Sequence, residues 1–214
     1  MLNFLKSNKK YIIFDIGSHK IAGISFKLYN GKPYIIGLDH QKSKGIRNNK
    51  LNDIEKLSLI IGKILRNIEK DYKRANFFCN ITDPNLTTTK KKTDLNAGKL
   101  GISKKEVRKI FRKSLNESEK KGKYLIHSNP NSFVLDDKGL TSNPIGKKCS
   151  KFSIISFNLL IDNYYVKKLN SSFFKNNINV KRFFDSGIAS SMSCLTSKEK
   201  EEGVVCIDIG GETS

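Results

Sequence analysis

Two short stretches of the chain combine the residue types that hold phosphate groups and a metal ion. The first reads FDIGS at residues 14–18, and the second reads IDIGG at residues 207–211. In each, an apolar run delivers an aspartate into a glycine turn. Glycine accepts positive φ and lets backbone N–H groups approach an oxyanion without a Cβ in the way. An aspartate at the end of a strand can hold the water shell of Mg²⁺. Two such loops on opposing halves of a fold would grip the phosphates of one nucleotide.

Either loop alone is a weak signal, because Asp-x-Gly after a strand is common in ordinary hairpins. The repetition is stronger, since the second loop follows after one half-molecule's worth of chain. Ser18 can donate to a phosphate and Lys20 can add positive charge, although a turn residue and a solvated strand residue are equally good interpretations. His19 is interpreted as a polar turn residue, because no carboxylate partner can be assigned to it.

The elements that position the first loop follow a recognisable order. Apolar and alternating runs predict three strands in a meander at residues 11–15, 20–28 and 33–38. An Asn-Asp start and helical spacing of apolar residues predict a helix from Asn52 to Tyr72, and a fourth strand follows at residues 76–81. Three strands, a helix and a strand open the ribonuclease H-like folds, which include the actin, sugar-kinase and Hsp70 ATPases.

The region from about 84 to 160 interrupts this scheme. It contains a lysine-rich strand, a helix opened by a capping box at Ser103 and Glu106, and strands at residues 124–135 and 151–161 joined by a glycine- and proline-containing loop. A helix from Asp162, a strand at 178–184, a short helix at 186–195, a charged link and an apolar strand from Val204 follow. The predicted fold class is α/β with a mixed sheet: the first half of an actin-like, ribonuclease H-like fold with a small inserted α+β domain.

Composition limits the possible partners. The net charge of +20 suggests nucleic acid or an anionic membrane, but the lysines are spread along the chain and arginine is scarce. Compositional bias is therefore favoured over a nucleic-acid-binding face. The four cysteines are far apart, as expected of free thiols in a reducing cytoplasm. The apolar start of the chain is too short for a secretory signal, and no run of about 18 apolar residues predicts a membrane span.

Two alternatives stay open on the residues alone. A sugar-kinase or Hsp70-type ATPase would have the same strand order, but no catalytic base or substrate pocket can be assigned. A metal-dependent nuclease would use Asp15, Glu55 and Asp83 as carboxylate ligands. Against the nuclease, Glu55 lies where a helix dipole favours an acid anyway, and Asp83-Pro84 is an ordinary turn signal.

Several stretches in order resemble the bacterial cell-division protein family FtsA, whose members are actin homologues. They are FDIGSHK at 14–20, IIG at 35–37 followed by SKGI at 43–46, NDIE at 52–55, LIH at 125–127, NPIG at 143–146, GIASS at 187–191 and DIGG at 208–211. The resemblance covers essentially all 214 positions. It implies subdomain 1A at residues 1–83 and 161–202, an inserted SHS2-like domain 1C at 84–160, and the start of a second half, 2A, at 203–214.

The resemblance also implies ligands, partners and a location. The cofactors would be ATP and Mg²⁺, and activity would be at most a weak ATPase. Cofactor-binding candidates are Asp15, Gly17, Ser18 and Lys20 in the first loop and Asp208, Gly210, Gly211 and Thr213 in the second, with Asp15 and Asp208 as metal candidates. The full-length protein would form filaments, bind the C-terminal tail of FtsZ, and recruit later division proteins through the inserted domain. It would be cytoplasmic and peripheral on the inner membrane at the division site, with no nucleic-acid partner.

Departures from the family pattern lower the expected affinity for nucleotide. Glu212 stands where the family usually has a third glycine, which adds a Cβ and a negative charge beside the expected phosphates. The stretches expected of an adenosine-binding loop, an FtsZ-binding subdomain and a C-terminal amphipathic helix are not found in the sequence. The chain by itself is therefore expected neither to close over a nucleotide nor to anchor to a membrane. Its apolar residues 204–209 are expected to be loosely held or aggregation-prone.

Overall fold

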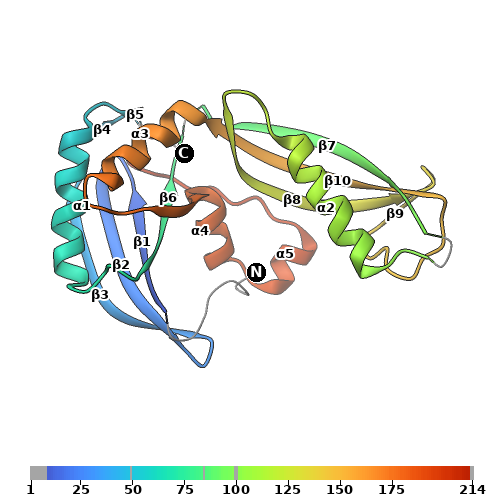
Figure 1. Ribbon diagram of the computed structural model, residues 1–214, viewed down its shortest axis with the longest axis horizontal. Coiled ribbons are helices and arrows are strands. Elements are labelled where there is room, and N and C mark those ends of the chain that lie inside the picture. The colour runs from blue at the N-terminus through green and yellow to red at the C-terminus, as the bar shows by residue number, and fades with distance from the viewer. Residues whose placement is uncertain (1–8, 49, 84, 99–100, 213–214) are drawn as a thin grey trace. The chain divides into compact units, whose positions relative to one another are not determined.

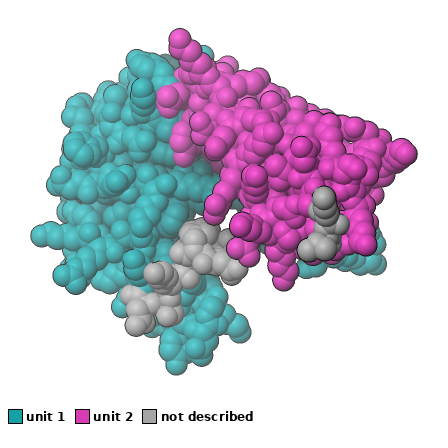
Figure 2. Space-filling view, turned by 45° about the vertical axis from the view of Figure 1, so that its right-hand side comes forward, with its two compact units in different colours: residues 1–84, 164–214 teal, residues 85–163 magenta. Residues whose placement is uncertain are grey.

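The computed structural model describes residues 9–48, 50–83, 85–98 and 101–212. The chain divides into two compact units, one formed by residues 1–84 with 164–214 and the other by residues 85–163 (Figure 2). Within the described residues, no helix combines the length and the apolar character needed to cross a membrane.

Unit 1 is built on a five-stranded mixed sheet with the strand order β11-β6-β1-β2-β3 (Figure 1). Its strands are β1 (Lys10–Ile16), β2 (Lys20–Tyr29), β3 (Lys32–Lys42), β6 (Asn76–Ile81) and β11 (Val180–Asp185). The first three form an antiparallel meander, while β6 runs parallel to both β1 and β11. The predicted meander and the predicted strand at 76–81 are confirmed.

Helices α1 (Ile54–Ile68) and α3 (Asn163–Phe174) pack against one face of this sheet. The ring of Phe14 lies edge-on to that of Phe173, with 5.4 Å between centroids. On β2, a Cβ added to Gly23 would come within 2.5 Å of a methyl carbon of Ile64. This glycine therefore lets α1 approach the sheet closely. The opposite face carries the stacked rings of Tyr11, Phe26 and Phe78.

The predicted helix is confirmed, but its end is not at Tyr72. α1 ends at Ile68, because Glu69 adopts an extended backbone with φ of −162° and closes the last turn through its N–H to the carbonyl of Leu65. Tyr72 packs edge-on against Phe77 instead. A short antiparallel pair that the sequence analysis missed, β4 (Ile46–Arg47) and β5 (Lys50–Leu51), precedes α1.

The last part of unit 1 differs from the prediction. The helix expected at 186–195 is α4 (Ser186–Cys194), but the supposed charged link forms a further helix, α5 (Ser197–Glu202), opened by a capping box between Thr196 and Glu199. Residues 204–209 are in no strand, so the predicted strand is wrong. Val205 and Ile209 are 90% and 81% exposed, because no described strand pairs with this segment.

Unit 2 is a four-stranded antiparallel sheet, ordered β7-β10-β8-β9, with one helix on it. Its elements are β7 (Thr87–Asn96), α2 (Lys104–Ser118), β8 (Lys123–Leu135), β9 (Gly139–Thr141) and β10 (Lys151–Asp162).

The core of unit 2 places Ile110 of α2 against Phe152 and Ile154 of β10. The predicted capping box at Ser103 and Glu106 is confirmed. Strand β9 occupies part of the predicted loop, because Asp136 and Asp137 both take positive φ and close a tight hairpin.

Candidate phosphate-binding site

The candidate site lies at one edge of the sheet in unit 1, where three strands deliver their carboxyl ends. Because β1, β6 and β11 run parallel, their carboxyl ends lie at the same edge of the sheet. Asp15, Ile81 and Asp185 lie at these ends. Ligands of open α/β sheets bind beyond the carboxyl ends of such strands. A pocket of about 490 Å³ opens there, within the usual size range of ligand sites. Its lining comprises residues 15–20, Asn80, Thr82, Ser186, Ser190 and residues 208–211.

The first loop has a fixed backbone. The N–H of Gly17 donates to the carbonyl of Lys20 at 3.1 Å and closes the turn between β1 and β2. The carbonyl of His19 accepts from the N–H of Ser43 at 3.0 Å, which ties the turn to the end of β3. The loop is therefore held by both neighbouring strands before any ligand binds.

The second loop comes into contact with the first. A Cβ added to Gly211 would lie 3.0 Å from the Cβ of His19, so any larger residue here would require one of the two loops to shift. Asp208 and Gly210 line the same pocket as the first loop. The structure thus brings together every candidate site residue except Thr213, which lies outside the described residues.

The pKa of Asp15 reflects the charges that surround this pocket. Burial raises the pKa of its carboxyl group, the positive charge of Lys20 lowers that pKa, and the negative charge of Asp208 raises it. The two aspartates are therefore close enough to repel one another, and a bound cation would relieve that repulsion. On β6, burial raises the pKa of the Cys79 thiol well above its usual value, with the charge of Asp15 adding to the effect. Cys79 is thus a neutral core thiol.

Four lining residues outside the two loops were missed by sequence reasoning: Asn80, Thr82, Ser186 and Ser190. The signal for two of them was available, because parallel pairing of β6 with β1 places Asn80 beside Asp15 and Thr82 just beyond the strand. The hydroxyl oxygen of Ser186 is buried and has no hydrogen-bond partner among the described residues. An unsatisfied buried hydroxyl that lines the pocket can donate to a phosphate oxygen or a bound water.

The residues present fit a magnesium ion held beside phosphates. Mg²⁺ usually takes one or two carboxylates and completes its shell with water and substrate phosphates, and the pocket supplies two carboxylates with glycine turns and hydroxyls around them. In the parts of the chain that the structure describes, no group of three or more His, Cys, Asp or Glu residues could hold a metal.

The nuclease arrangement of three carboxylates is not assembled. Glu55 forms an ion pair with Lys175 at 2.6 Å, and its side chain is 71% exposed. The pocket is lined by Asp15 but by neither Glu55 nor Asp83.

The arrangement of elements defines the class of fold. The chain in the solved structure titled "PilM-PilN type IV pilus biogenesis complex" superposes on 85% of this chain and 49% of its own length, with a TM-score of 0.53 and 10% sequence identity. At that identity the likeness shows the fold alone. It supports the actin-like class predicted from the element order, and the mixed sheet with its inserted unit agrees with that class. No protein-family model matches the chain.

Sequence comparison gives the particular relationship. "Cell division protein FtsA" of Buchnera aphidicola subsp. Schizaphis graminum is 28% identical over 218 residues, which cover 98% of this chain and 51% of that protein. FtsA of Helicobacter pylori strain J99 is 24% identical over 226 residues, which cover 93% of this chain and 46% of that protein. The predicted resemblance to FtsA is therefore confirmed. The chain spans about half the length of the curated relatives it matches.

Proposed function

We propose that this chain forms the nucleotide-phosphate-binding part of an actin-like cell-division protein related to FtsA, with ATP and Mg²⁺ as its ligands. The observation that carries the proposal is the pocket in unit 1, where two separate Asp-x-Gly loops, with aspartates at positions 15 and 208, line one cavity. Two unrelated loops would have no reason to meet at the carboxyl ends of parallel strands.

Each lining residue has a defined part in this proposal. The backbone N–H groups of Gly210 and Gly211 approach phosphate oxygens, while Lys20 supplies positive charge from one side. Gly17 shapes the first loop, because its N–H closes the turn onto the carbonyl of Lys20. Asp15 and Asp208 hold the hydrated Mg²⁺, which when bound neutralises the charge of the phosphates. The buried Ser186 hydroxyl donates a further hydrogen bond. These groups bind and orient, and they do not include an assigned catalytic base.

The wider role rests on the relatives. We propose that the full-length protein assembles as filaments, links FtsZ polymers to the cytoplasmic face of the inner membrane, and recruits later septum proteins. In that assignment residues 1–83 and 161–202 are subdomain 1A, residues 84–160 are the inserted domain 1C, and residues 203–214 begin the second half. The resemblance to proteins named FtsA supports each of these points.

Nuclear magnetic resonance titration of the ¹⁵N-labelled chain with ATP tests the proposed site. We expect weak binding in fast exchange, because Glu212 adds a negative charge beside the expected phosphates. Shifts should be centred on residues 16–20, 80–82, 186–190 and 208–211. A thermal shift is less suitable, because ligand at a concentration equal to its dissociation constant adds only about 0.4 kcal/mol of stability.

Variants separate the metal from the phosphates. Asp15→Asn and Asp208→Asn should abolish the extra shifts caused by adding Mg²⁺ while keeping those caused by ATP in a chelator. Glu201→Gln removes an exposed carboxylate on α5 and should change neither. Shifts centred on unit 2, or an unchanged magnesium response in both aspartate variants, would contradict the proposal.

A phosphotransferase of the same superfamily is the second candidate. It predicts ATP turnover that rises when a small acceptor such as a sugar is added. We expect no acceptor-dependent turnover, because in this proposal both carboxylates of the pocket, Asp15 and Asp208, hold the magnesium ion.

A further inference from the structure

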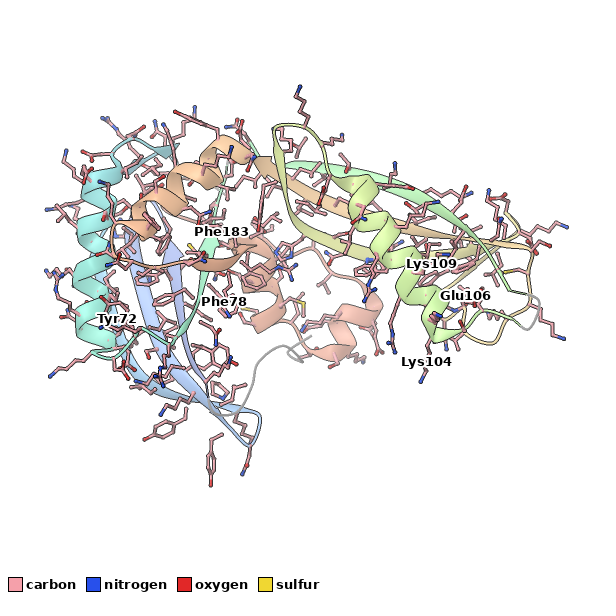
Figure 3. All side chains as sticks on the ribbon, in the orientation of Figure 1. Tyr72, Phe78, Lys104, Glu106, Lys109 and Phe183 are labelled. Atoms are coloured by element: carbon pink, nitrogen blue, oxygen red, sulfur yellow. The ribbon has the colours of Figure 1, made fainter. Side chains whose placement is uncertain are left out.

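The outward face of α2 carries a dense basic strip. Six exposed residues form two adjacent rows at a spacing of four: Lys104, Arg108 and Arg112 in one row and Lys105, Lys109 and Lys113 in the other. Residues four apart are neighbours on a helix surface. At a rise of 1.5 Å per residue the strip is about 14 Å long. Figure 3 labels Lys104 and Lys109 on this helix.

Little negative charge balances the strip. The Glu106 carboxylate is turned back onto the cap, where it accepts from the N–H groups of Ser103 and Gly98 at 2.8 Å each. The carboxylate of Glu117 forms ion pairs with the Nζ atoms of Lys113 at 3.7 Å and Lys91 at 3.8 Å. Among the described residues, no salt bridge joins the row of Lys104, Arg108 and Arg112 to any carboxylate.

The strip leads into a basic pocket. Asn116 follows Arg112 in the same row and lines a hollow of about 640 Å³, together with three lysines, Lys120, Lys121 and Lys123, and one carboxylate, Glu119. Leu115, Tyr124 and Leu125 form its apolar part. Helix and hollow both lie within unit 2. The surface therefore combines a row of cations with a recess that suits a phosphate-bearing headgroup.

The same helix cannot insert an apolar face. Its apolar side is already committed to the core of unit 2, where Ile110 is fully buried against Phe152 and Ile154. Ser114 is also buried, and its hydroxyl is hydrogen-bonded to that of Ser156 at 3.0 Å. Any contact made by the outward face is therefore electrostatic and leaves the fold unchanged.

We propose that the basic face of α2 and its adjoining lysine pocket form a docking surface for a bilayer that contains anionic phospholipids. Charge complementarity is the argument, since lysine and arginine near an anionic surface each raise partitioning by about fivefold. Nucleic acid is less suited, because the strip itself has no aromatic side chain on which a base could stack, and Tyr124 of the pocket is half-buried. This contact needs no terminal amphipathic helix, in contrast to the membrane attachment that the family resemblance implies. It is also independent of the nucleotide site.

Vesicle co-sedimentation of the full chain tests the surface. Phosphatidylcholine vesicles are compared with equimolar phosphatidylcholine and phosphatidylglycerol, at low and raised salt and without nucleotide. We expect binding only to the anionic vesicles, weakened by salt. The variant Lys104→Gln/Arg108→Gln/Arg112→Gln should partition roughly 100-fold more weakly, at about fivefold for each basic residue removed.

The matched control is Lys32→Gln/Lys63→Gln/Lys73→Gln, which removes the same charge from exposed positions of unit 1. It should retain partitioning within a few fold. An equal loss in both triple variants would overturn the proposal in favour of net charge alone. Two results together would assign the surface to nucleic acid instead. The first is that DNA displaces the chain from vesicles at matched phosphate concentration. The second is that the triple variant in α2 loses affinity for DNA as well as for vesicles.

A second measurement needs no variant. Vesicles that carry a paramagnetic headgroup lipid should broaden the amide resonances of residues 104–123 before those of α1. Broadening centred elsewhere would overturn the proposal. Asp15→Asn should leave vesicle binding intact, so failure of the membrane surface and failure of the nucleotide site are distinguishable.

Discussion

At the scale of single residues, the ionised carboxylate of Asp15 lowers the stability of the folded chain. Asp15 lies near the carboxyl end of β1, and its carboxylate is partly buried. Desolvation there disfavours the charged form, and the charge of Asp208 adds repulsion. Only Lys20 acts in the opposite direction. A side chain kept where its charge is unfavourable is expected at a ligand site, where a bound cation restores the balance.

Replacing Asp15 with asparagine should stabilise the chain at neutral pH. Because the folded-state pKa is raised above 3.8, the stability that this group contributes is present below that value and is lost as pH rises through the folded pKa. The urea midpoint of Asp15→Asn should thus exceed that of the unsubstituted chain at about pH 7, and the difference should shrink toward about pH 4. A lower midpoint for the variant at neutral pH, without ligand, would contradict the assignment.

At the scale of elements, α2 combines a favourable start with an unfavourable surface. Like charges four residues apart each cost a helix a few tenths of a kcal/mol, and two such rows lie on its outward face. The capping box offsets part of this, because Ser103 accepts from the N–H of Glu106 and the Glu106 carboxylate returns to the N–H of Ser103. The hydrogen bonds from Ser103 and Gly98 also lower the pKa of Glu106. The contribution of that carboxylate is therefore present at neutral pH and is lost as pH falls through its folded pKa.

Removing the cap should destabilise unit 2 measurably. Ser103→Ala should lower the free energy of unfolding by about 1 kcal/mol, because the N–H of Glu106 loses its acceptor. Ser103→Thr keeps a hydroxyl at the same position and should lose much less. The free energy of unfolding of both variants is measured by urea unfolding, with amide exchange in α2 as the local probe. Equal losses in the two variants would show that the hydroxyl acceptor is not the cause.

At the scale of the whole molecule, the two units have separate cores. Phe14 of β1 is fully buried against Phe173 in unit 1, whereas Phe152 of β10 is fully buried with Ile110 in unit 2. Each unit thus holds its own apolar cluster. The functions proposed here divide in the same way, with the nucleotide phosphates in unit 1 and the anionic surface on unit 2.

Core truncations should therefore act within one unit. Phe152→Ala should cost about 3–5 kcal/mol and remove amide-exchange protection from α2 and β8 while leaving β1 and β6 protected. Phe14→Ala should have the reciprocal effect. Uniform loss of protection throughout the chain in either variant would show that the units unfold as one.

Local sequence signals determined much of the secondary structure. Alternation and β-branched runs identify β1, β2 and β6, and the Ser103 and Glu106 spacing identifies the start of α2, because each depends on neighbours within a few residues. The same signals failed where the outcome depended on distant partners. Val205 and Ile207 have the composition of a buried strand, but no described strand pairs with them and they are 90% and 75% exposed.

The site divides along the same line. The sequence by itself identified the repeated Asp-x-Gly loops, since an aspartate followed by a glycine turn is a local chemical pattern. Only the tertiary structure decided that His19 and Gly211 meet, that Asp15 and Asp208 share one pocket, and that Ser186 contributes a buried hydroxyl. The parallel pairing of β1, β6 and β11 brings Asp15 and the start of α4 at Ser186 to one edge of the sheet, although they are far apart in the sequence. Likewise, the lysines of α2 are compositional bias in the sequence, and they become a surface only when the helix places them on one face.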